Sequence, residues 1–419
     1  MTTIDDIVRP LALTASLLAR FWPQLLLICT LGYIASDLLL RGAVLAGLHS
    51  PLAGLMVLSL VVLTKLLVVV MMFAVLRPGL PALASLRQNS AVRSPDAPET
   101  RSADHMLAVT AVVILPFFAF YAAWGFLGDT VRVYSRMALE AVPFGERADI
   151  FGMHRSRALI ASIVICWLIR WFAKRMNDRA HGPYWRLVIV AADASWIFIG
   201  LYALDVWKDE FITWIGAGAL LDELQTSALT SFSMVAHAAE GFTPVEFRSP
   251  ALLEQAQGLF FYALLPMVWL VMAAIINGYE LSAATAPVAA PPSRHSTWRK
   301  WLQDFITHFF GGYRSRYQPV WTCLKLTLGA GLATLITFVI AYRLIGWLGA
   351  WLWYGASRTL GIPDLDSWQV VFGVASLFIG SPSDLDGGIL LDAMRIALLA
   401  AVLEYCVASQ VTPKARAAI

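Results

Sequence analysis

The stretch PLAGLMVLSLVVLTKLLVVVMMFAVL, residues 51–76, decides the fold class of this chain. As a helix it is long enough to cross the ~30 Å hydrocarbon core of a bilayer. Lys65 is the one charged residue within it. The alternation of apolar and polar residues that a membrane β-barrel strand needs is absent from it. The stretch therefore predicts a transmembrane helix.

Similar apolar runs recur along the chain. Hydrophobic residues make up 59% and charged residues 14% of the sequence, against about 45–50% and about 25% in soluble domains. These values predict an all-α, polytopic integral membrane helix bundle, a single membrane domain over residues 1–419 with about eight transmembrane helices and a range of about seven to ten. The expected spans are residues 23–46, 51–76, 106–127, 158–175, 186–207, 258–279, 320–342 and 388–410.

Several apolar segments do not fit this count cleanly. Arg170 interrupts the fourth span, and apolar sequence continues past Arg343, the residue after the seventh span, as far as residue 357. The segments FITWIGAGALL (211–221) and SWQVVFGVASLFIG (367–380) are too short to cross a bilayer. Runs of this length are typical of interfacial or re-entrant helices, so we expect such helices beside the spans.

Two polar connections predict flexible cytoplasmic linkers. Residues 87–104 are rich in Pro and Ser with mixed charge, and residues 282–296 form a Pro/Ala tether. The tether leads into residues 297–310, where Trp and Phe recur at helical spacing opposite a partly basic face. This pattern favours an amphipathic helix in the inner-leaflet interface, the alternative being a helix packed on the bundle.

Lys and Arg gather in the connections that lie inside when the N-terminus is cytoplasmic, so both termini are expected in the cytoplasm. The connection 129–157 is basic and runs against this rule. Asp5 and Asp6 lie where a cleavable signal peptide would have basic residues, so no cleavable signal peptide is predicted. The expected arrangement is a short amphipathic segment followed by an uncleaved anchor at 23–46. The excess of Arg over Lys and the abundance of Ala fit a bacterial source, and hence a plasma membrane.

Charged residues within the spans are the candidate functional residues. Lys65, Asp193 and Glu404 lie near the middle or on the inner half of their spans and form one tier. An ionised side chain at this depth costs at least ~2.5–3.5 kcal/mol, so it is expected to face other helices or water. The tier predicts a pathway for an ion, proton or substrate, with Lys65 as counter-charge to both carboxylates. The alternative is a buried salt bridge that fixes helix pairing.

A second tier of charges lies on the outer half of the bundle. Asp37 and Arg41 are one helical turn apart and are expected to pair on their own helix. Asp392 and Arg395 belong to the same tier. Asp384, Asp386 and Asp392 could hold a divalent cation, although an N-cap of the last span is favoured.

Other chemistry is not indicated. The cysteines lie inside apolar runs and the histidines are scattered, so no disulfide framework, metal site or cofactor is expected. The net charge of +3 is too small to favour nucleic acid, and Walker, GxSxG and zincin motifs are absent.

Three classes of function follow. The favoured one is a transporter- or permease-like protein, not an enzyme, with the bilayer as its surroundings and a charged site between helices. The second is a non-catalytic scaffold or assembly subunit with other membrane subunits as partners. The third, an enzyme acting on lipid-linked substrates, rests only on the Asp-x-Asp pairs at 364–366 and 384–386.

Overall fold

The computed structural model describes most of the apolar part of the chain. The described residues are 3–85, 109–110, 113–114, 117–118, 126–141, 156–180, 183–216, 252–283, 331–361, 364–380 and 388–417. Apart from single residues at helix ends, all of them are helical, and none is in a strand. The predicted linker 87–104, nearly all of 282–296, the amphipathic segment 297–310, and Asp384 and Asp386 lie outside the described residues.

Membrane character is supported by four helical stretches of the described chain. They are long and apolar enough to cross a membrane: Ile7–His49, Pro51–Gly79, Tyr184–Leu201 and Leu332–Thr359. Two shorter apolar stretches are Tyr262–Asn277 and Asp366–Ile379. An all-helical bundle with membrane-spanning helices therefore agrees with the sequence, whereas the count of about eight spans stays a prediction.

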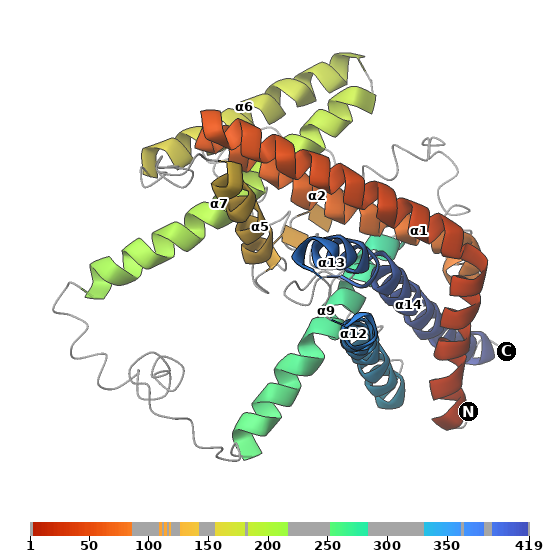
Figure 1. Cartoon of the computed structure of the whole chain (residues 1–419). Helices are drawn as coiled ribbons and strands as arrows, with labels where there is room; N and C mark the ends of the chain where they lie inside the picture. Colours follow the sequence, from red (N-terminus) through yellow and green to blue (C-terminus); the bar gives the residue numbers. More distant parts are fainter. Residues whose placement is uncertain are drawn as a thin grey trace, which may run out of the picture.

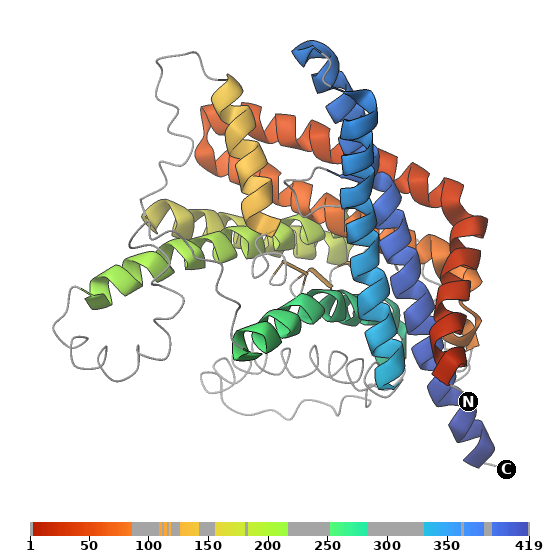
Figure 2. The same cartoon turned by 60° about the horizontal axis from the view of Figure 1, so that its bottom comes forward.

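Helix α1 (Thr3–His49) is longer than the sequence indicates. The amphipathic segment and the anchor 23–46, expected as separate elements, form one continuous helix of 47 residues. At ~1.5 Å per residue its length of about 70 Å is more than twice the hydrocarbon thickness. Pro10 and Pro23 lie inside it, and each removes a backbone hydrogen bond, which is a common cause of bending. The helix bends visibly in Figures 1 and 2.

Helix α2 (Pro51–Leu76) turns back along α1, and the 3₁₀ turn η1 (Arg77–Gly79) ends it. The turn between α1 and α2 is packed against helix α5 (Phe126–Ala141), whose Tyr134 is buried. The Tyr134 hydroxyl occupies the place where a Cβ on Gly47 would lie. A Cβ on Gly54 would lie 2.6 Å from the same hydroxyl and 2.8 Å from the Cα of Gly47. The two glycines therefore let three helices approach closely.

Helices α6 (Ser156–Ala180) and α7 (Pro183–Gly216) form an antiparallel hairpin, joined at residues 181–182. The two helices pack against each other, and in Figure 1 α6 lies along the top of the molecule. Helix α6 continues without a break past Arg170, so this charge does not end the fourth expected span.

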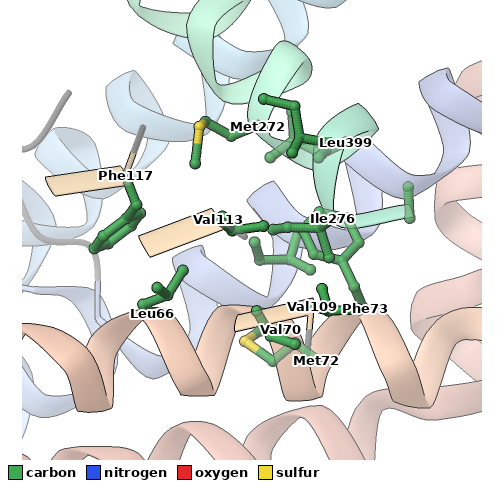
Figure 3. Packing of buried hydrophobic residues seen from close by; sticks show 14 of the residues in the cluster. Leu66, Val70, Met72, Phe73, Val109, Val113, Phe117, Met272, Ile276 and Leu399 are labelled. Carbon is green, nitrogen blue, oxygen red and sulfur yellow. The ribbon is translucent and has the colours of Figure 1, made fainter. Parts of the chain in front are cut away.

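The core lies where α2, the segment 109–118, α9 (Leu252–Ala283) and α14 (Ile389–Ala417) meet. Figure 3 shows Phe73 of α2, Met272 and Ile276 of α9, and Leu399 of α14 gathered around Val113. The six described residues of 109–118 are helical, recur at helical spacing and are all buried. One face of the third expected span is thus part of the core.

Helix α12 (Leu332–Leu360) corrects the end predicted for the seventh span, because it runs unbroken through Arg343 to Leu360. Helix α13 (Leu365–Ile379) follows, with Asp364 as its N-cap, and corresponds to the short segment 367–380. The indole N–H of Trp353 on α12 donates to the Gly380 carbonyl at 2.7 Å, which fixes the end of α13. Gly388, just before α14, packs directly on the backbone of residues 378–380.

Candidate functional site

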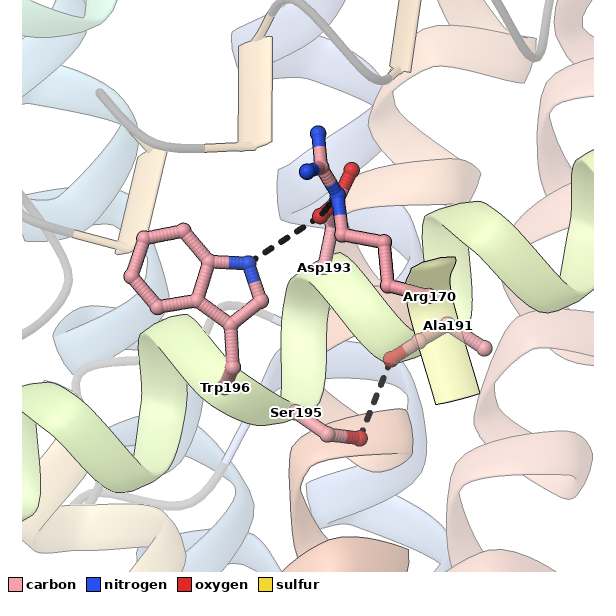
Figure 4. A network of polar contacts seen from close by, with 5 residues as sticks. All are labelled: Arg170, Ala191, Asp193, Ser195 and Trp196. Carbon is pink, nitrogen blue, oxygen red and sulfur yellow. Dashed lines mark hydrogen bonds and ion pairs between the residues drawn. The ribbon is translucent and has the colours of Figure 1, made fainter. Parts of the chain in front are cut away.

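The most buried ion pair described in the structure joins the two helices of the α6–α7 hairpin. Arg170 Nε lies 2.5 Å from Asp193 Oδ1, and their side chains are 34% and 17% exposed. The same oxygen accepts a hydrogen bond of 3.0 Å from the indole N–H of Trp196 (Figure 4). A carboxylate within an apolar helix thus has a cation beside it and one neutral hydrogen-bond donor.

The hairpin explains why these two residues meet. Arg170 precedes the connection 181–182 by as many residues as Asp193 follows it. In an antiparallel helix pair with a short connection, residues equally distant from the turn lie at the same height. Both charges are costly in an apolar environment when unpaired, and the equal spacing brings them together.

The opposite face of α7 carries a second polar contact. Ser195 is two positions after Asp193, which turns its side chain by about 200° around the helix. Its hydroxyl lies 2.8 Å from that of Ser59 on α2, and both residues are buried. Each hydroxyl also approaches a carbonyl of its own helix, Met56 for Ser59 and Ala191 for Ser195. One polar residue of α7 therefore contacts α6 and the other contacts α2.

Two hydroxyl protons serve three contacts here. Each hydroxyl carries one proton, so when one serine donates to the other helix, only the other serine can donate to its own carbonyl. The contact is neutral and directional. It holds α7 on α2 independently of the charge on Asp193.

Lys65 is half-buried on α2. It follows Ser59, the residue that contacts α7, by about 9 Å along the helix. The described ionic partner of Asp193 is Arg170, a residue that the sequence analysis treated only as an interruption of a span. The predicted association of Lys65 with Asp193 stays a prediction.

Glu404 has a different surrounding from Asp193. Its side chain is buried, with 4% of the residue exposed, and its two oxygens accept hydrogen bonds from the backbone N–H groups of Ala82 and Leu83 at 2.5 and 3.1 Å. These amides begin the helical residues 81–85, so Glu404 of α14 acts as a cap from another element. Lys65 lies about 16 Å, measured along the helix axis, before the last residue of α2. The amides of Ala82 and Leu83 come after that residue in the chain. The described contacts of Asp193 and Glu404 therefore do not bring the predicted tier of Lys65, Asp193 and Glu404 together.

The outer-tier residues form two pairs on two separate helices. Arg41 Nε lies 2.9 Å from Asp37 Oδ2 on α1, as expected from their spacing, and the side chains are 67% and 39% exposed. Arg395 Nη1 lies 3.2 Å from Asp392 Oδ1 on α14. The Arg395 guanidinium also lies over the ring of Tyr342 on α12, 5.7 Å from its centroid.

Arg343 forms a further link that sequence reasoning missed. Its guanidinium donates to the backbone carbonyl of Tyr262 on α9 and lies 3.7 Å from the centroid of the tyrosine ring. A carbonyl and a ring face satisfy the charge without a carboxylate. Sequence spacing contains no signal for this contact, because α9 and α12 are far apart in the chain.

One carboxylate of the Asp-x-Asp pairs has a structural role. Asp364 accepts from the backbone N–H of Ser367 at 3.3 Å and caps α13. The hydrogen bonds from Ser367 hold the pKa of this exposed carboxyl below its usual value. Among the described residues, no group of three or more His, Cys, Asp or Glu side chains could hold a metal ion.

In comparisons with known proteins, no protein-family model, no curated protein and no solved structure matches the chain.

Proposed function

We propose that this chain is a transporter- or permease-like protein of about eight helices in a plasma membrane, with both termini in the cytoplasm. Its central element is the Arg170–Asp193 ion pair between α6 and α7. The observation that carries the proposal is this pair, placed at matching heights of two paired helices and still 34% and 17% exposed. Charged groups at such positions are characteristic of ion and proton pathways.

The negative charge on Asp193 is what draws α6 to α7 through this pair. A neutral carboxyl no longer attracts the Arg170 guanidinium, so the attraction that draws α6 to α7 weakens. The Ser59–Ser195 contact is neutral and keeps α7 on α2. The charge on Asp193 would therefore control α6 relative to the α2–α7 pair, with Lys65 as a further positive charge near the path.

Proton flux is the direct test, because a proton is the smallest species that this pair would handle. The purified protein is reconstituted into liposomes that contain a pH-sensitive dye, and a pH gradient is imposed with the membrane potential clamped by valinomycin. The wild type should dissipate the gradient faster than empty liposomes, and Asp193→Asn should slow the flux at least about tenfold. Asp37→Asn is the matched control, since Asp37 also pairs with an arginine but is on the exposed side of α1.

A charge swap separates a pathway from a structural lock. In the variant Arg170→Asp/Asp193→Arg, the ion pair can re-form with reversed polarity. We expect the swap to restore the thermal unfolding midpoint that either single variant lowers, but not the proton flux. A swap that restored both would contradict a pathway, and a wild type no faster than empty liposomes would contradict proton transport.

A scaffold or assembly subunit is the second candidate. It is favoured by the large apolar side chains exposed on α1, α6 and α12, among them Trp22, Trp167 and Trp347. Such surfaces suit either lipid or other membrane subunits. Purification in a mild detergent distinguishes the two candidates: a scaffold should retain a partner at fixed stoichiometry, whereas a transporter should be active without one.

A further inference from the structure

We propose that the tip of the α6–α7 hairpin is a binding surface for anionic phospholipids. The hairpin tip is formed by the last turns of α6 and the first turn of α7, and consists of Trp171, Phe172, Lys174, Arg175, Tyr184 and Trp185. The proposal is independent of the transport activity, because it concerns the outer surface of the hairpin and not its ion pair.

The first argument is the one-sided packing of α6. Cys166 and Ala173, two turns apart on one face, are 1% and 0% exposed where α6 packs on α7. Trp167 and Trp171, on the remaining surface, are 56% and 53% exposed. The apolar surface is therefore continuous around most of the helix, and in a membrane protein lipid acyl chains are the solvent for such a surface.

The second argument is the order of aromatic and charged groups. Phe172 packs edge-on against Trp185, and Trp185 against Tyr184, with centroids 6.1 and 5.9 Å apart. The Arg175 guanidinium lies over the ring of Trp171, 5.8 Å from its centroid. Trp and Tyr prefer the headgroup level of a bilayer, and Lys and Arg extend from there towards the phosphates.

Charge complementarity selects anionic lipids over zwitterionic ones. Lys174 and Arg175 are exposed and Arg186 is half-buried. The sequence of the tip, residues 174–186, holds four basic residues against the single acidic residue Asp178. A ring face attracts a guanidinium without neutralising its charge, so Arg175 stays available to a phosphodiester. Basic groups between or beside membrane helices on the cytoplasmic side bind anionic headgroups in this way. The connection between α6 and α7 is predicted to face the cytoplasm.

Arg358 on α12 provides a matched control. It is also exposed and donates to an aromatic side chain, the Tyr354 hydroxyl at 2.8 Å. However, the acidic residues Asp364 and Asp366 follow shortly after it at the start of α13. A single cation that two carboxylates follow in the sequence should not prefer an anionic headgroup.

The experiment measures lipid selectivity on the full chain. The protein is placed in nanodiscs that contain phosphatidylcholine with a minor share of phosphatidylglycerol, and the lipids that remain bound on release into the gas phase are identified by native mass spectrometry. We expect the wild type to retain phosphatidylglycerol well above its share. Lys174→Gln/Arg175→Gln should lower this preference about tenfold, and Arg358→Gln should leave it unchanged.

Unfolding midpoints in the same nanodiscs control for damage to the fold. Lys174, Arg175 and Arg358 are all exposed and should tolerate glutamine. Equal retention of the two lipids by the wild type would overturn the proposal, as would a double variant that keeps the preference. A protein partner that remains bound at the tip and excludes the lipid would also overturn it.

Discussion

Asp193 and Ser195 are two positions apart on α7, yet their side chains hold different helices. Asp193 pairs with Arg170 of α6, and Ser195 contacts Ser59 of α2. At the scale of the residue, this division separates an ionic contact from a neutral one. Removal of one member of a buried charge pair is expensive because the other member stays in an apolar surrounding.

Glu404 allows a sharper test at the same scale. The variant Glu404→Ala leaves the buried N–H of Leu83 and the part-buried N–H of Ala82 without an acceptor, which should lower the free energy of unfolding by about 1–3 kcal/mol. Glu404→Gln keeps one acceptor oxygen but turns an amide NH₂ towards the second N–H, so it should fall between the wild type and the alanine variant. Unfolding in mixed micelles measures both values. Equal stability of all three proteins would show that the hydrogen bonds to Ala82 and Leu83 contribute nothing.

At the scale of the element, the close approach of α1, α2 and α5 depends on two glycines. Gly47→Ala places a methyl group on the Tyr134 hydroxyl, and we expect a loss of about 1–3 kcal/mol in stability. The additional substitution Tyr134→Phe removes the clashing oxygen and should recover most of that loss. Unfolding midpoints of the single and double variants measure the recovery.

Gly54→Ala provides the contrast, because its methyl group would also meet the backbone of Gly47, which cannot move aside as a side chain can. Tyr134→Phe should therefore not rescue it. A rescue of both glycine variants, or of neither, would contradict the packing of this turn.

The positions of the helices were largely predictable from apolar run length, but their ends were not. The expected spans 51–76, 186–207 and 258–279 lie within α2, α7 and α9. Arg170 was expected to interrupt the fourth span, and the seventh was expected to end just before Arg343, yet both arginines lie inside continuous helices. A charge limits an apolar run in the sequence, but an ionic partner or a carbonyl on a neighbouring helix satisfies it in the fold.

The candidate site was predictable only in part for the same reason. Asp193 and Glu404 were expected to face other helices or water. Glu404 is buried, and the Asp193 side chain, 17% exposed, faces α6. Their contacts depend on tertiary pairing, which apolar periodicity does not contain. The Arg170 contact is the exception, since the equal spacing around the short connection 181–182 was visible in the sequence.

At the scale of the whole molecule, the beginning of α1 and the end of α14 lie close together in both views (Figures 1 and 2). The two termini therefore lie at the same end of the molecule. The distribution of Lys and Arg predicts that this end faces the cytoplasm.

Cysteine labelling tests that orientation. Cysteines introduced at Thr3 and, separately, at Ala417 should react with a membrane-impermeant maleimide only after the cells are broken. The native Cys29, Cys166 and Cys406 are buried, so a background with Cys323→Ser should label weakly. Labelling of either position on intact cells would contradict two cytoplasmic termini.

The contact between Gly388 and the backbone of residues 378–380 has a practical consequence. The chain leaves α13 and enters α14 at almost one point, so the two ends of the connection are already joined in space. Lengthening a closed connection costs little, because each doubling of its length adds only about 0.6 kcal/mol of closure entropy. An epitope or a small fluorescent protein inserted between Gly380 and Gly388 should therefore leave the helices in place, which makes this connection a suitable point for a fiducial marker in cryo-EM.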